Sequence, residues 1–274
     1  MDNKNFLPVK SDILFRLFFA DERNETFLVD FLKSVLKLPD DDYNEIEIAN
    51  PHLLREFEDD KMSIIDVKLH TKSRKIIHIE IQLKVSFELK NRIVLYDSKL
   101  ITEQIKIGKE YDVIKKVISI IITDDELIEG SPKYHHRFTF YDPKANVEFT
   151  DIIEIHALEL KKLPDGYDGT QLYDWAKFIA AESDDELTAV AKRNPEVNKA
   201  VVNYRELTAD EYTRDLYERR EKARRDQVSR EKDAKLESIK ERNIEIAKNL
   251  LTMNLPLDQI SKATGLSVDE IEEL

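Results

Sequence analysis

The stretch SIIDVKLHTKSRKIIHIEIQLKV, residues 63–85, contains two runs in which apolar and polar side chains alternate. In both runs most odd-numbered positions are Ile, Val or Leu, and most even-numbered positions are polar or charged. A period of two is typical of a β-strand with one apolar face. The polar connection Lys72-Ser73-Arg74 predicts a tight antiparallel hairpin of strands 63–71 and 75–85.

The same pattern predicts the register of this hairpin. Both apolar faces lie on one side of the sheet only if residues of equal parity face each other, which a connection of odd length allows. Asp66 is then opposite Glu80, and Lys68 is opposite His78. Two facing carboxylates repel each other, which favours a cation bound between them. The alternative is that these acids and the nearby lysines form the solvated outer face of an ordinary hairpin.

A magnesium ion, for which manganese can substitute, suits such a pair of acids. Mg²⁺ binds one or two protein carboxylates and keeps its other positions for water and phosphate oxygens. Gln82 lies two residues after Glu80 on the same face. Its amide can orient a water molecule, but it can neither act as a base nor carry charge. Lys84 or Lys68 is therefore expected to supply positive charge.

The hydrophobic period becomes helical between residues 87 and 107, and Gly108 is expected to end this helix. Its apolar side consists of Leu89, Ile93, Tyr96 and Leu100. Arg92 lies one turn before Tyr96, and its guanidinium can bind a phosphate group. The candidate phosphate-binding side chains are Lys84, Arg92 and Lys99, and Tyr96 is a candidate supporting residue.

The other segments predict a mixed α/β protein. Two short helices at 11–19 and 25–38 precede the hairpin, and a continuous apolar run at 113–123 predicts a buried strand. Two more strands are expected at 137–141 and 147–160. From residue 164 the pattern is helical, with helices expected near 171–182, 184–193, 195–205 and 208–253.

The composition excludes several kinds of site. The chain of 274 residues has no cysteine, which excludes disulfides, thiolate zinc sites and cysteine nucleophiles. His70 and His78 have no third imidazole at a suitable spacing for a metal site, so they are expected at the surface. Without a signal-like N-terminus or an apolar run long enough for a membrane span, we expect a cytoplasmic protein.

Charge is distributed unevenly along the chain. The net charge of -13 disfavours a nucleic-acid ligand, because phosphates bind where Lys and Arg gather. Residues 61–116, however, contain 13 Lys and Arg against 7 Asp and Glu. This basic block includes Asp66 and Glu80, so it can surround them with a positive field. The alternative is that its lysines only solvate the strands and the helix.

Several motifs around these residues resemble a known family. They are KSDILFRLFF at 10–19, IEIQ at 79–82, Arg92-x-x-x-Tyr96, Lys99-Leu100, Gln104, Gly108 and YDVI at 111–114. Together they resemble the Rpn family of recombination-promoting nucleases and transposases in the PD-(D/E)xK superfamily. The resemblance covers residues 6–124 closely and the helical remainder more loosely.

The resemblance implies a restriction-endonuclease-like mixed sheet flanked by helices, with an all-α C-terminal extension. It also implies a Mg²⁺-dependent DNA endonuclease linked to recombination or transposition. Asp66 matches the first metal-binding acid, Glu80 the second, and Gln82 the lysine of (D/E)xK, so Asp66, Glu80 and Gln82 are the expected catalytic residues. Gln departs from the superfamily's lysine, although the Rpn-like branch is similar in carrying ExQ. The alternative is a non-catalytic protein-interaction module that retains this fold.

Three domains are expected. Residues 1–163 form the nuclease-like domain, 164–245 a helical extension with a long charged helix, and 246–274 a small helical hairpin with a helix-turn-helix layout. The sequence VDEIEEL at 268–274 would bring four carboxylates to DNA phosphates, which favours packing or homo-oligomerisation for this last segment over DNA reading.

Overall fold

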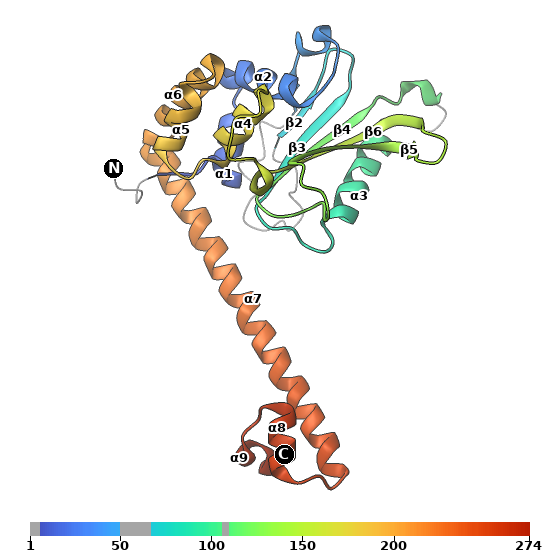
Figure 1. Ribbon diagram of the computed structural model, residues 1–274, viewed down its shortest axis with the longest axis vertical. Coiled ribbons are helices and arrows are strands. Elements are labelled where there is room, and N and C mark those ends of the chain that lie inside the picture. Colours follow the sequence, from blue (N-terminus) through green and yellow to red (C-terminus); the bar gives the residue numbers. More distant parts are fainter. Residues whose placement is uncertain (1–5, 50–66, 106–109) are drawn as a thin grey trace. The chain divides into compact units, whose positions relative to one another are not determined.

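The computed structural model describes residues 6–49, 67–105 and 110–274 (Figure 1). The chain divides into two compact units, Met1–Tyr217 and Glu218–Leu274. The first unit is mixed α/β, as the sequence predicts, and the second is all-α. The helices between residue 164 and Tyr217 belong to the first unit together with the sheet.

A six-stranded mixed sheet forms the centre of the first unit, with strand order β1-β2-β3-β4-β6-β5. The strands are β1 (Glu47–Ile48), β2 (Val67–His70), β3 (Ile76–Gln82), β4 (Val117–Thr123), β5 (His135–Asp142) and β6 (Val147–Glu159). Neighbours β3, β4 and β6 are parallel, whereas β1, β2 and β5 extend the sheet with antiparallel pairs. The carboxyl ends of the three parallel strands therefore lie at one edge of the sheet.

The hairpin of β2 and β3 has the predicted register in its described residues. Lys68 is opposite His78, and Leu69 is opposite Ile77. The turn is closed by Arg74, which adopts a left-handed φ of 64° and donates its backbone N–H to the carbonyl of Thr71. Asp66 lies outside the described residues, so its pairing with Glu80 stays a prediction.

One face of the sheet packs on the main hydrophobic core. The helices on this face are α1 (Asp12–Phe19), α2 (Glu25–Val35), α4 (Gln171–Ala180), α5 (Asp184–Ala191) and α6 (Pro195–Ala209), and Figure 1 shows them gathered together. The short 3₁₀ turns are η2 (Glu22–Asn24), η3 (Asp40–Tyr43), η4 (Tyr111–Val113) and η5 (Leu160–Lys162). Side chains from α1 and α4, among them Phe18, Phe19 and Trp175, form an aromatic cluster in this core.

The opposite face of the sheet is covered by α3 (Leu89–Thr102). Leu89 and Ile93 pack against Ile121 of β4, and His78 and Glu80 of β3 are buried in the structure. The alternative in which Glu80 belongs to a solvated outer face is therefore wrong, because Glu80 is buried. The helix ends earlier than the sequence predicts, and Gly108 lies outside the described residues.

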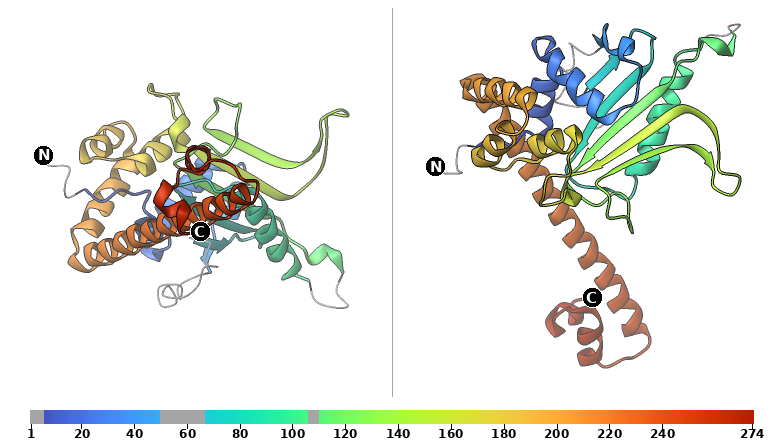
Figure 2. Two further views of the ribbon diagram at one scale, coloured as in Figure 1. Left: turned by 90° about the horizontal axis from the view of Figure 1, so that it is seen from below. Right: turned by 45° about the horizontal axis from the view of Figure 1, so that its top comes forward.

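The second unit contains most of α7 (Glu211–Thr252), followed by α8 (Leu257–Thr264) and α9 (Val268–Glu272). Figure 2 shows α8 and α9 folded back beside the end of α7. Gly265 ends α8 with a φ of 74°, and Ser267 and Glu270 form a reciprocal capping box at α9. The small core of this unit consists of Ala247, Ile260, Leu266 and Ile271. Across the described ranges, no helix is both long and apolar enough to cross a membrane.

Candidate active site

Glu80 and Gln82 lie two residues apart on β3, so both side chains are on the face that α3 covers. Gln82 is beside Thr123 of β4, which in turn is beside Glu159 of β6. These three residues mark the carboxyl ends of the parallel strands. Open α/β sheets bind ligands at this edge. Glu80 is only 3% exposed, whereas Gln82 is half-buried at the end of its strand.

Arg92 of α3 joins Glu80 and Gln82 through one nitrogen. Its Nη2 donates to Glu80 Oε1 at 2.9 Å and to Gln82 Oε1 at 3.3 Å. Because a guanidinium has only donors, the amide atom that faces it must be the oxygen. Leu89 and Ile93, which flank Arg92 on the helix, are buried against the sheet and fix the position of this turn.

The Arg92–Glu80 pair is partly desolvated. The side chain of Glu80 is 4% exposed and that of Arg92 is 33% exposed. A buried carboxylate without a partner is strongly unfavourable, so a positive charge beside Glu80 stabilises its ionised form. The guanidinium supplies this charge and still reaches solvent.

A second polar group lies deeper under α3. His78 Nε2 is 2.7 Å from Asp97 Oδ1, and Ser119 Oγ of β4 contacts both side chains. None of the three residues is more than 1% exposed. The expectation that His78 lies at the surface is therefore wrong. Because a water molecule cannot reach this group without an opening of the helix, its role is to hold α3 on the sheet.

Asp97 is not among the candidate residues predicted from the sequence, although its position in the helix indicates burial. It lies four residues after Ile93 and three before Leu100, which places it on the apolar side of α3. The sequence predicts Tyr96 on that side instead, whereas the structure leaves Tyr96 half-buried. An acid in the middle of an apolar stripe indicates a buried partner, and here the partners come from β3 and β4.

Glu159 at the end of β6 is fully buried, yet its contacts are structural. Its Oε1 accepts the backbone N–H groups of Leu127 and Ile128 at 2.7 and 3.0 Å. Lys162 Nζ lies 3.0 Å from the same oxygen, and His136 Nδ1 lies 3.5 Å from Oε2. These partners account for the charge of Glu159 and fix the segment that follows β4.

The remaining candidates from the sequence do not contact Glu80 or Gln82. Lys84 is exposed just after β3, and Lys99 is exposed two helical turns beyond Arg92. The Nζ of Lys99 lies 5.5 Å from the ring centroid of Tyr96, a cation–π contact. Of the residues named from the sequence, the structure thus brings together Glu80, Gln82 and Arg92, and Asp66 lies outside the described residues.

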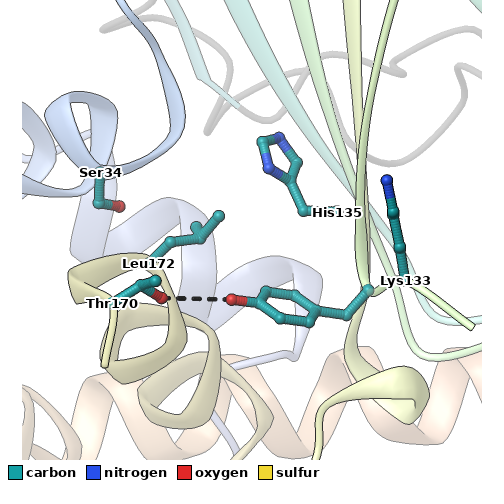
Figure 3. A pocket seen from close by; sticks show the side chains of 6 residues that line it. Ser34, Lys133, His135, Thr170 and Leu172 are labelled. Carbon is teal, nitrogen blue, oxygen red and sulfur yellow. Dashed lines mark hydrogen bonds between the residues drawn. The ribbon is translucent and has the colours of Figure 1, made fainter. Parts of the chain in front are cut away.

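A pocket of about 330 Å³ lies on the opposite face of the sheet. Figure 3 shows Lys133 and His135 on one side of it and Thr170 and Leu172 on the other. Burial, together with the neighbouring His156, lowers the pKa of His135 to about 4. This imidazole is therefore uncharged near neutral pH and offers no positive charge to an anionic ligand.

Next to this pocket, Glu154 is surrounded by donors. His156, Arg137 and Lys116 contact its carboxylate at 2.7, 2.6 and 2.8 Å. Burial acts to raise the pKa of Glu154, but these hydrogen bonds outweigh burial and hold it well below its usual range. Both carboxylate oxygens of Glu154 contact these side chains, so this cluster is an ion-pair network of the sheet.

A comparison with family models now bears on the site at β3. The model described as PD-(D/E)XK nuclease family transposase matches residues 9–234, which is most of the chain. The chain belongs to this family. Nothing matches among the curated proteins or among the solved structures.

Membership in the PD-(D/E)XK nuclease family transposases implies a nuclease or transposition role, and hence DNA as partner. The match extends beyond the sheet through α4, α5 and α6. This agrees with their shared core with the sheet. The matched range includes Glu80, Gln82 and Arg92.

Nucleases of this family typically use a divalent metal ion. The donor chemistry at β3 fits such an ion, because the carboxylate of Glu80 is a hard oxygen ligand. No cluster of three or more His, Asp or Glu side chains suited to a metal occurs in residues 6–49, 67–105 and 110–274. Asp66, the other acid expected from the sequence, lies outside these ranges.

Proposed function

We propose that this protein is a Mg²⁺-dependent DNA endonuclease of the Rpn type, which hydrolyses phosphodiester bonds during recombination or transposition. The observation that carries the proposal is Glu80, a buried carboxylate at the carboxyl edge of the parallel strands, with Gln82 and a cation beside it. Family membership supports the nuclease class. The predicted register of β2 and β3, found between Lys68 and His78, supports Asp66 as the first metal-binding acid, opposite Glu80.

In the proposed reaction, water adds to a phosphorus atom of the DNA backbone and one P–O ester bond breaks. The water contributes its hydroxyl to the phosphate end, and its proton is balanced by protonation of the leaving alkoxide. A bound Mg²⁺ would acidify water and neutralise negative charge on the phosphate. Asp66 and Glu80 would hold this ion. Gln82, whose Oε1 already accepts from Arg92, offers its NH₂ group to orient a water or phosphate oxygen.

The charge distribution supports DNA as substrate. The block 61–116 has a surplus of positive charge in an otherwise acidic chain, and Lys84 and Arg92 belong to it. The guanidinium of Arg92 is partly exposed beside Glu80, where a scissile phosphate would lie. We propose Arg92 and Lys84 as contacts to backbone phosphate, with Lys99 as a more distant contact.

The test is cleavage of supercoiled plasmid by the purified protein in Mg²⁺, Mn²⁺ or Ca²⁺. Nicked and linear products are expected with Mg²⁺ and Mn²⁺ for the wild type. The variants Asp66→Ala and Glu80→Ala should lose at least about 100-fold in rate, because a metal ligand is removed. Glu88→Ala is a matched control, since Glu88 is exposed at the start of α3 and its side chain makes no capping hydrogen bond.

Calorimetric titration with Mn²⁺ provides a readout that is independent of cleavage. Binding should be present in the wild type and in Glu88→Ala, and it should be weakened in Asp66→Ala. If the wild type binds no more metal than Asp66→Ala does, the nuclease proposal is wrong. The protein is then better described as an interaction module with a nuclease fold.

A further inference from the structure

We infer that Arg92 takes over the role of the lysine that Gln82 replaces, and that its guanidinium competes with the metal ion for Glu80. This inference rests on the proposed function, because it assigns a further residue to the same site. Its structural basis is the single nitrogen Nη2, which donates both to the acid and to the amide of the motif.

The positive charge beside Glu80 comes from α3 and not from β3. A lysine at residue 82 would place an ammonium group near the acid that precedes it by two residues on β3. In this chain residue 82 is an uncharged amide, and the guanidinium of Arg92 reaches it and Glu80 from α3. The guanidinium therefore provides, from a different element, the charge that the superfamily motif provides from the strand.

Several other cations of the first unit form ion pairs with acids other than Glu80. Lys10 is paired with Asp124 and Glu182, at 2.8 and 2.6 Å. Lys116 is paired with Asp151 and Glu154 at 2.7 and 2.8 Å. The side chain of each of these lysines is at most 13% exposed. Loss of the ion pair would leave a buried positive charge without a partner, which is unfavourable.

Two further lysines also form ion pairs with acids other than Glu80. Lys162 is paired with Glu159 at 3.0 Å, and Lys75 is paired with Asp42 at 2.5 Å. Arg92, in contrast, donates to the motif residues Glu80 and Gln82 themselves. This separates it from lysines that are close in sequence but serve the fold.

The guanidinium of Arg92 and a divalent cation would compete for the carboxylate of Glu80. A carboxylate oxygen that accepts a hydrogen bond from a guanidinium is less available to a divalent cation, because the two positive groups repel each other in a partly buried site. Removal of the guanidinium should therefore strengthen metal binding while it weakens catalysis. A residue with a purely structural role would weaken both.

The same geometry predicts the effect of restoring the lysine. Gln82→Lys alone would bring an ammonium group next to Nη2, which lies 3.3 Å from the present amide oxygen. Like charges at such a distance repel strongly in a desolvated site. Gln82→Lys should therefore be harmful with Arg92 present, and beneficial once Arg92 is neutral.

The experiment compares the wild type with Arg92→Gln, Gln82→Lys, the double variant Gln82→Lys/Arg92→Gln, and Arg92→Lys. Lys90→Gln is the matched control, since Lys90 is an exposed cation on the same helix. Two quantities are measured for each full-length protein: Mn²⁺ affinity by calorimetry, and the initial rate of plasmid cleavage at saturating Mg²⁺. Circular dichroism verifies the fold, and Arg92→Lys retains a positive charge beside Glu80 if Arg92→Gln does not fold.

For Arg92→Gln we expect Mn²⁺ to bind several-fold more tightly and cleavage to fall by about 100-fold or more, the usual loss when a stabilising donor is removed. The double variant should cleave at least about 10-fold faster than Arg92→Gln. Arg92→Lys should lie between the wild type and Arg92→Gln, and Lys90→Gln should resemble the wild type.

The inference is overturned if the double variant is no faster than Arg92→Gln, or if Arg92→Gln binds Mn²⁺ more weakly than the wild type does. In either case the wild type still binds metal and cleaves DNA, so the proposed function stands. Absence of Mn²⁺ binding in the wild type would instead overturn both the proposed function and the role of Arg92.

Discussion

His78 of β3 and Asp97 of α3 are joined by a hydrogen bond of 2.7 Å between side chains that are at most 1% exposed. Ser119 of β4 completes the contact, so one helix and two strands meet at this point. Arg92 lies five residues before Asp97 on the same helix, and Glu80 lies two residues after His78 on the same strand. The buried contact therefore fixes the elements that bring Arg92 and Glu80 together.

Asp97→Ala is expected to lower the free energy of unfolding by about 3 kcal/mol, because it leaves His78 and Ser119 buried without their partner. Urea denaturation measures this change. The control is Ser98→Ala, at an exposed neighbouring position, with an expected change within about 0.5 kcal/mol. Equal stabilities of the two variants would show that the buried contact contributes nothing net.

Arg92→Glu should weaken DNA binding and reduce its dependence on salt, because one phosphate contact and its released counterion are lost. Binding is measured with Ca²⁺ over a salt series. The slope of log K against log salt should decrease in magnitude by about 1 or more. Lys133→Glu, at the pocket on the other face of the sheet, reverses a charge without this effect. An unchanged slope in Arg92→Glu would place the phosphate contact elsewhere.

His135 should make stability depend on pH below neutrality. Its pKa is about 4 in the folded protein against an ordinary value of 6.5, so between these values the unfolded chain binds a proton that the folded chain does not. Unfolding therefore becomes easier as pH falls from about 6.5 to about 4, and the effect of this group is complete below that range. In His135→Gln, the free energy of unfolding should change less between pH 7 and pH 4.5 than in the wild type. A pH dependence identical to that of the wild type would contradict this assignment.

The hairpin and its register could be predicted because alternation requires residues of equal parity to face each other, and the tight connection Lys72–Arg74 then selects one such pairing. Lys68 opposite His78 follows from these two constraints together. The cover over the polar face could not be predicted in the same way. Polar side chains occur at alternate positions of a strand both where that face is exposed to water and where a helix with polar side chains covers it. Here α3 covers the face, and its Asp97 contacts His78.

The candidate site shows the same division. Glu80 and Gln82 could be placed on one face because both belong to a single strand with a fixed period. The contact of Arg92 with both could not be derived, since it depends on how α3 lies across the sheet. The orientation of α3 on the sheet depends on how Leu89 and Ile93 pack against the strand residues beneath them. The periodicity of the sequence does not determine this orientation.

The middle of α7 has a consequence for how this protein can change over evolutionary time. Residues 222–230 and 232–242 are exposed all around the helix, and the family match ends within them at residue 234. The apolar cluster around Ala247 and Ile260 is complete without any side chain from the sheet. Insertions, deletions or exchanges of the C-terminal segment at this point leave both hydrophobic cores intact. Descendants of this gene can therefore acquire or replace their last helices while they inherit β3 and α3 unaltered.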